Sequence, residues 1–518
     1  MVQTESLKRM LEQHTEKREY LFSRGFYFTN RKVDVMAYPF YGLWKQEHIA
    51  DFTLLIHPKQ RLTIVNQGGV NTKILIGHAY DPIKLIADEQ QILEEIDDDF
   101  YENLCNLTGV FTLILIKEGK VNVYGDATGM QTTFFTLKDG IQIASHTNLI
   151  GDLNGYHWDK YAEELISYRF YPLLGNSMPG DLTQFKEVKR LTPNHELTIA
   201  DGKWTIQRFY WPSKQRISKE EICDRVTELM RNNLQLITEK WKRPAISLTG
   251  GCDSKTTLAC ANGLYDRFQY FSYISSPQES VDAKAAEEIS RVLGLKHKTH
   301  LISEHDDDFE DLDIHKALLY HNTGSMRRNN ANDIRKRCYY ANMDEFDVEI
   351  KSWASEIGRA YYSKRFNNRK DFGSTPTPRK LTTMYKFFLH NRKLVRQTDR
   401  IFKEYLEKYF EQAKENPIDW QEQIFWEFRC ASWNGLVITE EHRYSFDITI
   451  PYNNRRILEL LLSVPIEDRI NDTIYKMIRA KMNPQIDATG IAVTNVLHTH
   501  RRAVLEGIYY TLHSKLPL

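Results

Sequence analysis

The first part of the chain alternates short β-branched and aromatic runs with turn signals. We predict strands at 52–57, 110–116, 121–124, 132–136 and 141–144. Between neighbouring runs lie Glu118-Gly119 and Asp139-Gly140, dipeptides typical of hairpin turns. Helical patterns near 87–95 and 158–168 interrupt the strands. Residues 25–210 therefore predict a mostly antiparallel sheet with a few helices.

The pattern changes near Trp211. From Ser218 onward long amphipathic stretches dominate, broken by apolar strands at 244–248, 268–274 and 346–350. Strand alternating with helix implies a parallel sheet, which binds ligands at the carboxyl ends of its strands. A chain of 518 residues also exceeds a single typical core. We therefore predict two domains, residues 1–212 and 213–518.

Composition narrows the classes of partner. Lys+Arg and Asp+Glu number 69 each, so no global field attracts nucleic acid or an anionic membrane. No apolar run approaches the roughly 20 residues of a membrane-spanning helix, and the start shows no secretory pattern. Six scattered cysteines include no Cys-x-x-Cys pair, which argues against a zinc ribbon or redox pair. We expect a cytoplasmic protein that binds neither nucleic acid nor membrane.

The most informative segment is 244–254, Pro-Ala-Ile-Ser-Leu-Thr-Gly-Gly-Cys-Asp-Ser. An apolar run, two glycines and a helical pattern at 255–261 predict strand, tight loop and helix. Gly250 and Gly251 allow a positive φ and a close approach of backbone to ligand. The amides of 251–254 open the helix, where unpaired donors and the helix dipole favour phosphate.

The chemistry of this loop suits pyrophosphate. It lacks the lysine of a Walker-type P-loop. Thr249 and Ser254 add hydroxyl donors, and Asp253 can hold the magnesium that accompanies a nucleoside triphosphate. The predicted cofactors are a nucleoside triphosphate and Mg²⁺. The predicted cofactor-binding residues in the loop are Leu248, Thr249, Gly250, Gly251, Cys252, Asp253 and Ser254. The alternative is an ordinary strand-to-helix turn with Asp253 or Ser254 as N-cap.

Two crossover units follow the loop. We predict a helix at 255–263, a strand at 268–274, a helix at 282–294 and a strand at 298–302. In this order, Leu248 ends the first strand and Ile274 ends the second, so both are placed to flank an adenine. Plain core packing is the alternative for each of them.

These residues resemble those of a known family. The loop is similar to the Ser-Gly-Gly-x-Asp-Ser loop of the ATP pyrophosphatase superfamily, with Thr249 in place of the first serine. Over most of its length the chain resembles the asparagine synthetase family and its relative β-lactam synthetase. The segments that carry the resemblance are 107–116, 124–130, 191–197, 352–362, 446–455 and 475–479.

The resemblance implies a fold and a mechanism. It implies an α+β, Ntn-hydrolase-like glutaminase-type sandwich, then an α/β adenine-nucleotide α-hydrolase-like (ATP pyrophosphatase) domain with a parallel sheet and a helical C-terminal part. Glu356 matches the loop acid that would be the second magnesium ligand beside Asp253. Lys476 is the candidate cation near the oxyanion, so it and Asp253 are the predicted catalytic residues. The base for the amine stays open among Tyr361, Tyr362 and Glu440.

Departures from the family pattern matter as much. That family hydrolyses glutamine with a cysteine directly after the initiator Met, whereas Val2 stands here and the first cysteine is Cys105. We expect no glutaminase activity, as in β-lactam synthetase and lasso-peptide cyclases, whose amine comes with the substrate. Ser352 and Ala354 replace glycines of the family's loop, and Thr449 replaces an arginine. The acid and amine substrates should therefore differ from aspartate and ammonia.

The function predicted is an ATP-dependent amide synthetase. It would adenylate a carboxylate, release pyrophosphate and transfer the acyl group to an amine. Its partners would be small-molecule or peptide carboxylates and amines, and a homodimer is allowed. One alternative is an adenylating tRNA-modifying enzyme, against which the neutral charge and unpaired cysteines count. The other is a non-catalytic homologue that keeps the fold.

Overall fold

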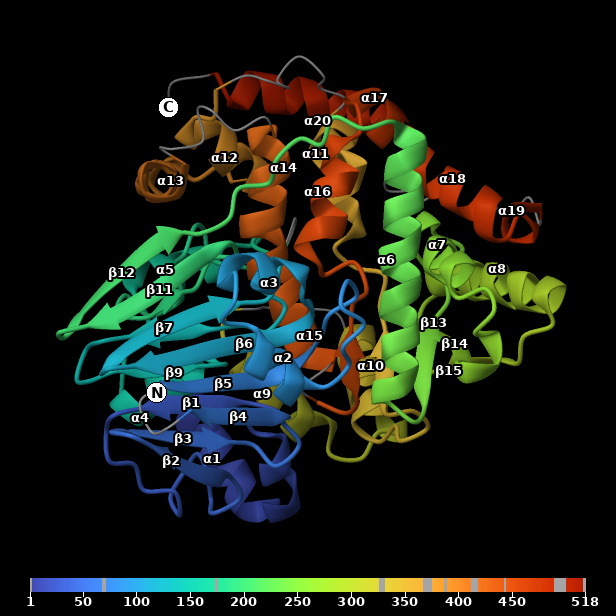
Figure 1. Ribbon diagram of the computed structural model, residues 1–518. Helices are drawn as coiled ribbons and strands as arrows, with labels where there is room; N and C mark the ends of the chain where they lie inside the picture. Colours follow the sequence, from blue (N-terminus) through green and yellow to red (C-terminus); the bar gives the residue numbers. More distant parts are fainter. Residues whose placement is uncertain are drawn as a thin grey trace.

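The computed structural model describes residues 2–67, 71–172, 176–325, 331–366, 375–385, 389–410, 418–441, 444–488 and 500–515. Over these residues the protein is a mixed α/β structure with two antiparallel six-stranded sheets and one parallel five-stranded sheet. Figure 1 shows the antiparallel sheets at the lower left, the parallel sheet at the lower right and the C-terminal helices at the top. The coarse prediction, antiparallel sheet first and parallel sheet second, is confirmed.

The antiparallel sheets take up the strands of the first part of the chain. One has the order β10-β8-β9-β1-β3-β2 and the other the order β12-β11-β7-β6-β5-β4. The first contains β1 (Phe26–Thr29), β2 (Lys45–Ile49), β3 (Phe52–Ile56), β8 (Phe134–Thr136), β9 (Gln142–Ala144) and β10 (Lys189–Arg190). The second contains β4 (Leu62–Gln67), β5 (Asn71–Tyr80), β6 (Thr108–Lys117), β7 (Lys120–Gly125), β11 (His195–Ala200) and β12 (Lys203–Arg208). The five strands predicted for this part of the chain are all present, and the prediction missed the other strands of the two sheets.

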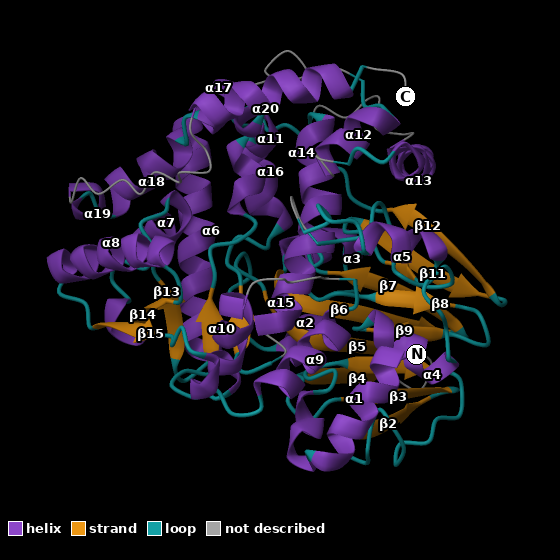
Figure 2. Cartoon of the chain, turned by 180° about the vertical axis from the view of Figure 1, so that it is seen from behind, coloured by secondary structure: helices purple, strands orange, loops and turns teal. Residues whose placement is uncertain are grey.

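The two sheets pack face to face between helices. Successive side chains of β5 point to opposite faces of its sheet, and both faces are covered. Ile74 and Ile76 enter the core between the two sheets, whereas Leu75 packs against the helices on the outer face. Outside the first sheet lie α1 (Val2–Gln13), α4 (Thr147–Asn154) and α9 (Leu312–Thr323). Outside the second lie α2 (Glu89–Glu95) and α3 (Phe100–Asn106). The layers are helix, sheet, sheet, helix (Figure 2).

The parallel sheet has the order β15-β14-β13-β16-β17. Its strands are β13 (Pro244–Ser247), β14 (Gln269–Ile274), β15 (His297–Leu301), β16 (Val348–Ile350) and β17 (Asp447–Thr449), all paired in parallel. The crossover helices α7 (Cys252–Cys260) and α8 (Pro277–Leu293) follow β13 and β14. After β15 the chain returns to the other side of β13, so the strand order reverses between β13 and β16. Such a reversal opens a crevice at the carboxyl ends of the strands.

Helices make up most of the remaining chain. They are α5 (Lys160–Ile166), α6 (Lys219–Lys240), α10 (Ala331–Ala341), α11 (Tyr361–Arg365), α12 (Pro378–Tyr385), α13 (Arg392–Phe410), α14 (Trp420–Ile424), α15 (Gly435–Glu441), α16 (Arg455–Ser463), α17 (Ile466–Ile470), α18 (Thr473–Met482), α19 (Gln485–Ala488) and α20 (His500–His513). A π-helix (Phe425–Asn434) joins α14 to α15. Among the helices described, none is both long enough and apolar enough to cross a bilayer. The predicted boundary at 212 lies between β12 and α6 and stays a prediction.

A buried segment joins the parallel sheet to the antiparallel strands. Directly after β17, Asn453 donates from Nδ2 to the carbonyl oxygen of Gly109 at 2.6 Å and to Asp126 Oδ1 at 2.9 Å. Its Oδ1 accepts the hydroxyl of Thr128 at 2.7 Å. The next residue but one, Arg455, is fully buried and donates from Nε to Asn194 Oδ1 at 2.8 Å. Hydrogen bonds of two buried side chains therefore hold the C-terminal part against the sheet of β6 and β7.

We expect Asn453→Ala to destabilise the protein by about 1–3 kcal/mol, because it leaves buried donors and acceptors unpaired. Urea denaturation would measure the free energy of unfolding. Asn471→Ala, at an exposed position, is the control and should change it by less than about 0.5 kcal/mol. Equal effects of the two substitutions would contradict the role given to Asn453.

Candidate functional site

A cavity of about 320 Å³ lies at the carboxyl end of β13. It sits where the strand order reverses, the position expected for a ligand in an open parallel sheet. Three segments line it: the end of β13 with the start of α7, the end of β14 with α8, and the loop after β16. Its lining residues are Ser247, Leu248, Thr249, Gly251, Asp253, Ser254, Ser272, Tyr273, Glu279, Asp282, Ala283, Lys351, Ser352, Trp353 and Glu356.

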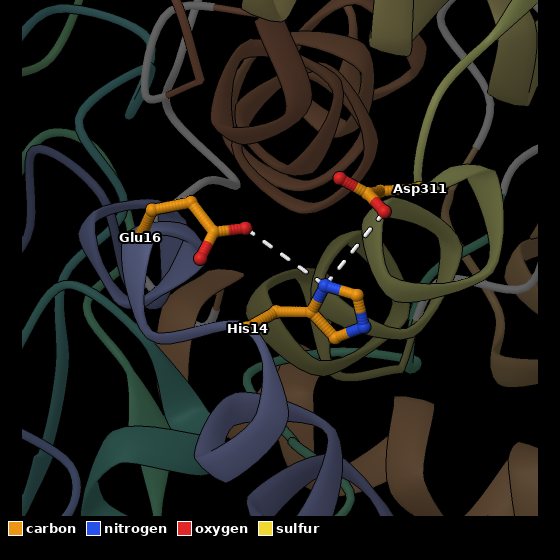
Figure 3. A group of neighbouring side chains, drawn as sticks. All are labelled: His14, Glu16 and Asp311. Carbon is orange, nitrogen blue, oxygen red and sulfur yellow. Dashed lines mark ion pairs between the residues drawn. The ribbon is translucent and has the colours of Figure 1, made fainter.

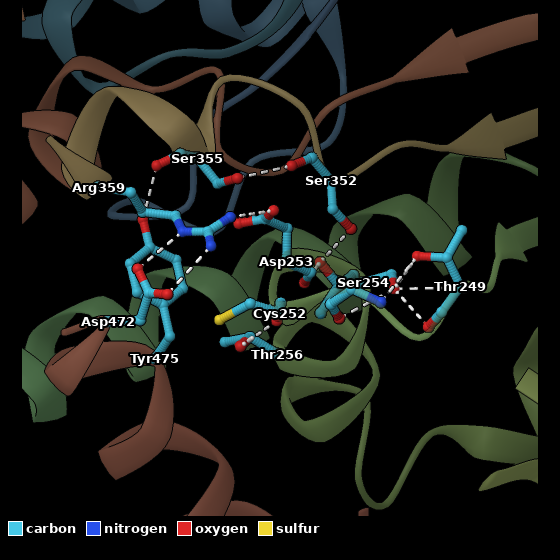
Figure 4. A network of polar contacts seen from close by, with 12 residues as sticks. Thr249, Cys252, Asp253, Ser254, Thr256, Ser352, Ser355, Arg359, Asp472 and Tyr475 are labelled. Atoms are coloured by element: carbon cyan, nitrogen blue, oxygen red, sulfur yellow. Dashed lines mark hydrogen bonds and ion pairs between the residues drawn. The ribbon is translucent and has the colours of Figure 1, made fainter. Parts of the chain in front are cut away.

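The loop before α7 is held by its own hydroxyl groups (Figure 4). Ser254 Oγ donates to the carbonyl oxygen of Thr249 at 2.9 Å, and the two hydroxyl oxygens lie 2.9 Å apart. The amide of Gly251 donates to Thr249 Oγ1 at 3.2 Å, and that of Gly250 to Asp282 Oδ1 at 3.2 Å. Thr249 and Ser254 therefore shape the turn, and α8 braces it through Asp282.

Two expectations about this loop need correction. Gly251 has φ −70° and neither glycine has a positive φ, because the N-cap of a helix takes an extended conformation. That N-cap is Gly251, so the alternative with Asp253 or Ser254 as N-cap is wrong. The helix begins at Cys252, earlier than predicted, and the amides of its first turn have no intrahelical acceptor. Within the described part of the chain, the amides of Cys252, Asp253 and Ser254 can donate to a ligand, whereas that of Gly251 already donates to Thr249.

Two carboxylates meet at the cavity from loops far apart in the sequence. Asp253 lies in the first turn of α7, and Glu356 lies in the 3₁₀ helix Ser355–Arg359 after β16. Asp253 Oδ1 and Glu356 Oε2 are both buried, and neither has a hydrogen-bond partner within the part of the chain that the structure describes. Burial and the neighbouring charge of Asp253 raise the pKa of Glu356 to about 7. Two carboxylate oxygens that line one cavity, and that have no partner among the described residues, fit a divalent cation such as Mg²⁺, which takes oxygen ligands.

An arginine that the sequence analysis missed completes this group. Arg359 Nη1 donates to Asp253 Oδ2 at 2.5 Å, and its Nε and Nη2 donate to Asp472 at 2.9 and 3.0 Å. Lys364 Nζ also bonds Asp472, at 2.6 Å. Glu356 and Arg359 are three residues apart in a 3₁₀ helix, whose side chains eclipse at that spacing. That spacing was the signal available in the sequence.

Of the remaining predicted site residues, some line the cavity and others do not. Leu248 is buried and lines the cavity, whereas Ile274 is half-buried at the end of β14 and does not. Cys252 turns toward α18, with Arg479 Nη1 3.2 Å from its Sγ, and burial raises the pKa of its thiol. Lys476 is exposed and does not line the cavity. Its neighbour Tyr475 is buried instead and donates to the carbonyl oxygen of Ser355 at 2.7 Å.

The lining of the cavity is acidic. Carboxylates of Asp253, Glu279, Asp282 and Glu356 reach it, and Lys351 is its basic residue. Lys351 bonds Glu349 at 2.9 Å and Glu441 at 2.7 Å, so its charge is already compensated. Such a lining repels a bare polyphosphate and accepts one that arrives as a metal complex.

The candidates for a base stay open. Tyr361, Tyr362 and Glu440 are not among the residues that line the cavity. Burial raises the pKa of Tyr361, but the charges of Arg429 and Arg365 outweigh it, and the net shift is downward. Burial raises the pKa of Tyr362.

A second cluster of metal-ligating residue types lies on the surface (Figure 3). His14 Nδ1 is 3.8 Å from Glu16 and 3.7 Å from Asp311. Lys17 Nζ lies 3.1 Å from Asp311 and lowers the pKa of that carboxyl. Because an ammonium already occupies Asp311, we interpret this cluster as surface ion pairs.

Comparisons with known proteins add little. No protein-family model matches the sequence, and no curated protein matches it significantly. Three solved structures resemble the fold: the allosteric regulatory enzyme of purine biosynthesis, glutamine phosphoribosylpyrophosphate amidotransferase from B. subtilis complexed with ADP and GMP, and glutamine-dependent NAD⁺ synthetase from Acinetobacter baumannii in complex with ADP.

The three likenesses are remote. Their sequence identities are 8%, 9% and 12% and their TM-scores 0.24, 0.23 and 0.20. The matches cover 61%, 65% and 62% of this chain and 90%, 71% and 84% of the other chains. At these scores the likeness carries no argument about function.

We expect the stability of the metal-free protein to depend on pH through Glu356. The pKa of this carboxyl rises from 4.5 to about 7 on folding, so the folded protein binds more protons between these values. The stability it contributes is complete below pH 4.5 and is lost as the pH rises through 7. Urea denaturation with a chelator at about pH 5 and pH 8 would measure the free energy of unfolding. From the lower to the higher pH it should fall more for wild type than for Glu356→Gln.

Added Mg²⁺ provides the complementary readout. The metal binds the ionised carboxylate, so it should restore stability to the wild type at about pH 8 and not to Glu356→Gln. Identical pH profiles of the two proteins, with and without Mg²⁺, would contradict the geometry of the carboxylate pair.

Proposed function

We propose that the protein is an ATP-dependent synthetase that activates a carboxylate as an acyl-adenylate and joins it to an amine. The observation that carries the proposal is the pair of unpaired carboxylate oxygens, Asp253 Oδ1 and Glu356 Oε2, beside the first turn of α7. They lie at the carboxyl end of the central strand of a parallel sheet, in a cavity large enough for a small ligand.

The residues of the loop would bind the leaving group. In the reaction, a carboxylate oxygen attacks the α-phosphorus of ATP, pyrophosphate leaves, and an amine then displaces AMP from the acyl carbon. Asp253 and Glu356 would hold Mg²⁺, which when bound neutralises the negative charge of the phosphates. The free amides of the first turn of α7 would donate to the pyrophosphate. Leu248 would pack against the adenine.

We further propose that the protein does not hydrolyse glutamine. Helix α1 precedes the first strand, β1, and contains no cysteine. Cys105, the first cysteine of the sequence, is buried on α3, and burial raises the pKa of its thiol. A thiol of that kind is a poor nucleophile. The amine would therefore come with the second substrate.

The oxyanion of the acyl-transfer step also needs a cation. Lys476 remains a prediction for that role, and its side chain would have to turn from the exposed face of α18 to reach the cavity. The identity of the acid and the amine is left to experiment. Small-molecule or peptide substrates both fit the proposal.

We expect Asp253→Asn and Glu356→Gln to lower the rate of pyrophosphate release by at least about 100-fold, because each removes a metal ligand. The assay would contain ATP, Mg²⁺ and a panel of carboxylates paired with amines, including aspartate with ammonia. Asp266→Asn, at an exposed position beyond α7, is the matched control and should leave the rate unchanged.

Two outcomes would contradict the proposal. Pyrophosphate release that requires tRNA would favour an adenylating tRNA-modifying enzyme. No release and no nucleotide binding under any condition would favour a non-catalytic homologue.

A further inference from the structure

Arg359 lies between Asp253 and Asp472 and forms ion pairs with both (Figure 4). Its guanidinium is about four-fifths buried and lies between Asp253 on α7 and Asp472 at the start of α18. The contact with Asp472 is bidentate, through Nε and Nη2, so it fixes the plane of the guanidinium. Asp472 in turn is held by Lys364.

This arrangement leaves donors unused. A guanidinium has five N–H donors, and carboxylates of the described residues take three of those of Arg359. Two N–H groups therefore remain, one on Nη1 and one on Nη2. Nη1 bonds Asp253 Oδ2, and the other oxygen of that carboxylate, Oδ1, has no partner among the described residues, so the guanidinium and the metal position would share one carboxylate.

The charges around Arg359 would change when a metal arrives. In the absence of a ligand, the cations of Arg359 and Lys364 balance the carboxylates of Asp253 and Asp472. A divalent cation on Asp253 and Glu356 would take up the charge of Asp253 and leave this group with an excess positive charge. Lys351 gains no such excess, since Glu349 and Glu441 pair with it and neither is proposed to bind the metal.

We propose that Arg359 is the phosphate-binding cation of the site, receiving the β- and γ-phosphates of ATP, and that Asp472 positions it. This inference rests on the proposed function and adds a residue that the resemblance does not supply. Arg359 does not itself line the cavity but bonds Asp253, which does, so the β- and γ-phosphates would extend past Asp253 to reach the remaining donors of Arg359.

The test compares the binding of ATP and AMP in the presence of Mg²⁺ by isothermal titration calorimetry with the full chain. Arg359→Met should weaken the binding of ATP about 10- to 100-fold, as expected for lost hydrogen bonds to a charged group. It should leave the affinity for AMP unchanged. Arg359→Lys keeps the charge and should recover part of the loss. Asp472→Asn should also weaken the binding of ATP, by a smaller factor than Arg359→Met.

The matched control is Arg365→Met. Arg365 lies six residues further along, pairs with Glu506 on α20 at 3.2 Å and donates to Tyr361 OH at 3.0 Å, and it has no ion pair with Asp253 or Glu356 among the described residues. Its substitution should change neither affinity. Thermal melts of all variants would check that each is folded.

The outcomes separate the inference from the proposed function. If wild type binds no ATP with Mg²⁺, the proposed function fails and the inference with it. If wild type binds ATP and Arg359→Met binds it equally well, the inference alone fails. Equal losses for ATP and AMP, or a lysine variant no better than methionine, would also overturn it, because either result points to packing rather than to phosphate binding.

Discussion

The parallel pairing of β13 with β16 is the constraint on which the candidate site depends. Ile246 lies opposite Ile350 in this pair, so the loops that follow the two strands leave the sheet at the same level. The first loop carries Asp253 and the second carries Glu356. Both carboxylates thereby reach one cavity, and burial together with the charge of Asp253 raises the pKa of Glu356. Arg359 offsets only part of that rise, because it bonds one oxygen of Asp253 and none of Glu356.

The same sheet connects the site to the rest of the molecule. Strand β17 pairs with β16 and leads directly into the segment that carries Asn453 and Arg455. These side chains bond the backbone and side chains around β6 and β7. The loop after β16 therefore rests on a sheet whose edge strand is itself held by the antiparallel part of the chain. This packing gives the antiparallel part of the chain a structural role.

Local pattern predicted the elements with strong signals. Residues 110–116 are apolar and β-branched, and they lie in β6. Strand β5 was missed although it is as long as β6 and pairs with it along its whole length. Its Lys73, Gly77 and His78 interrupt the apolar run, and only pairing with neighbours on both sides makes the segment a strand. The glycine loop was located correctly. Its backbone conformation was not, because the N-cap geometry of α7 sets the φ of Gly251.

The sequence by itself determined that a strand, a polar glycine loop and a helix follow one another at 244–260, since each depends on neighbouring residues. It also located both acids of the pair, through their motifs. Only the tertiary structure decided that Arg359 and Asp472 join Asp253, and that Lys476 faces solvent while Tyr475 is buried. The physical reason is that ion pairs and burial depend on which segments meet in space, and a helix turned by one residue presents a different side chain to the site.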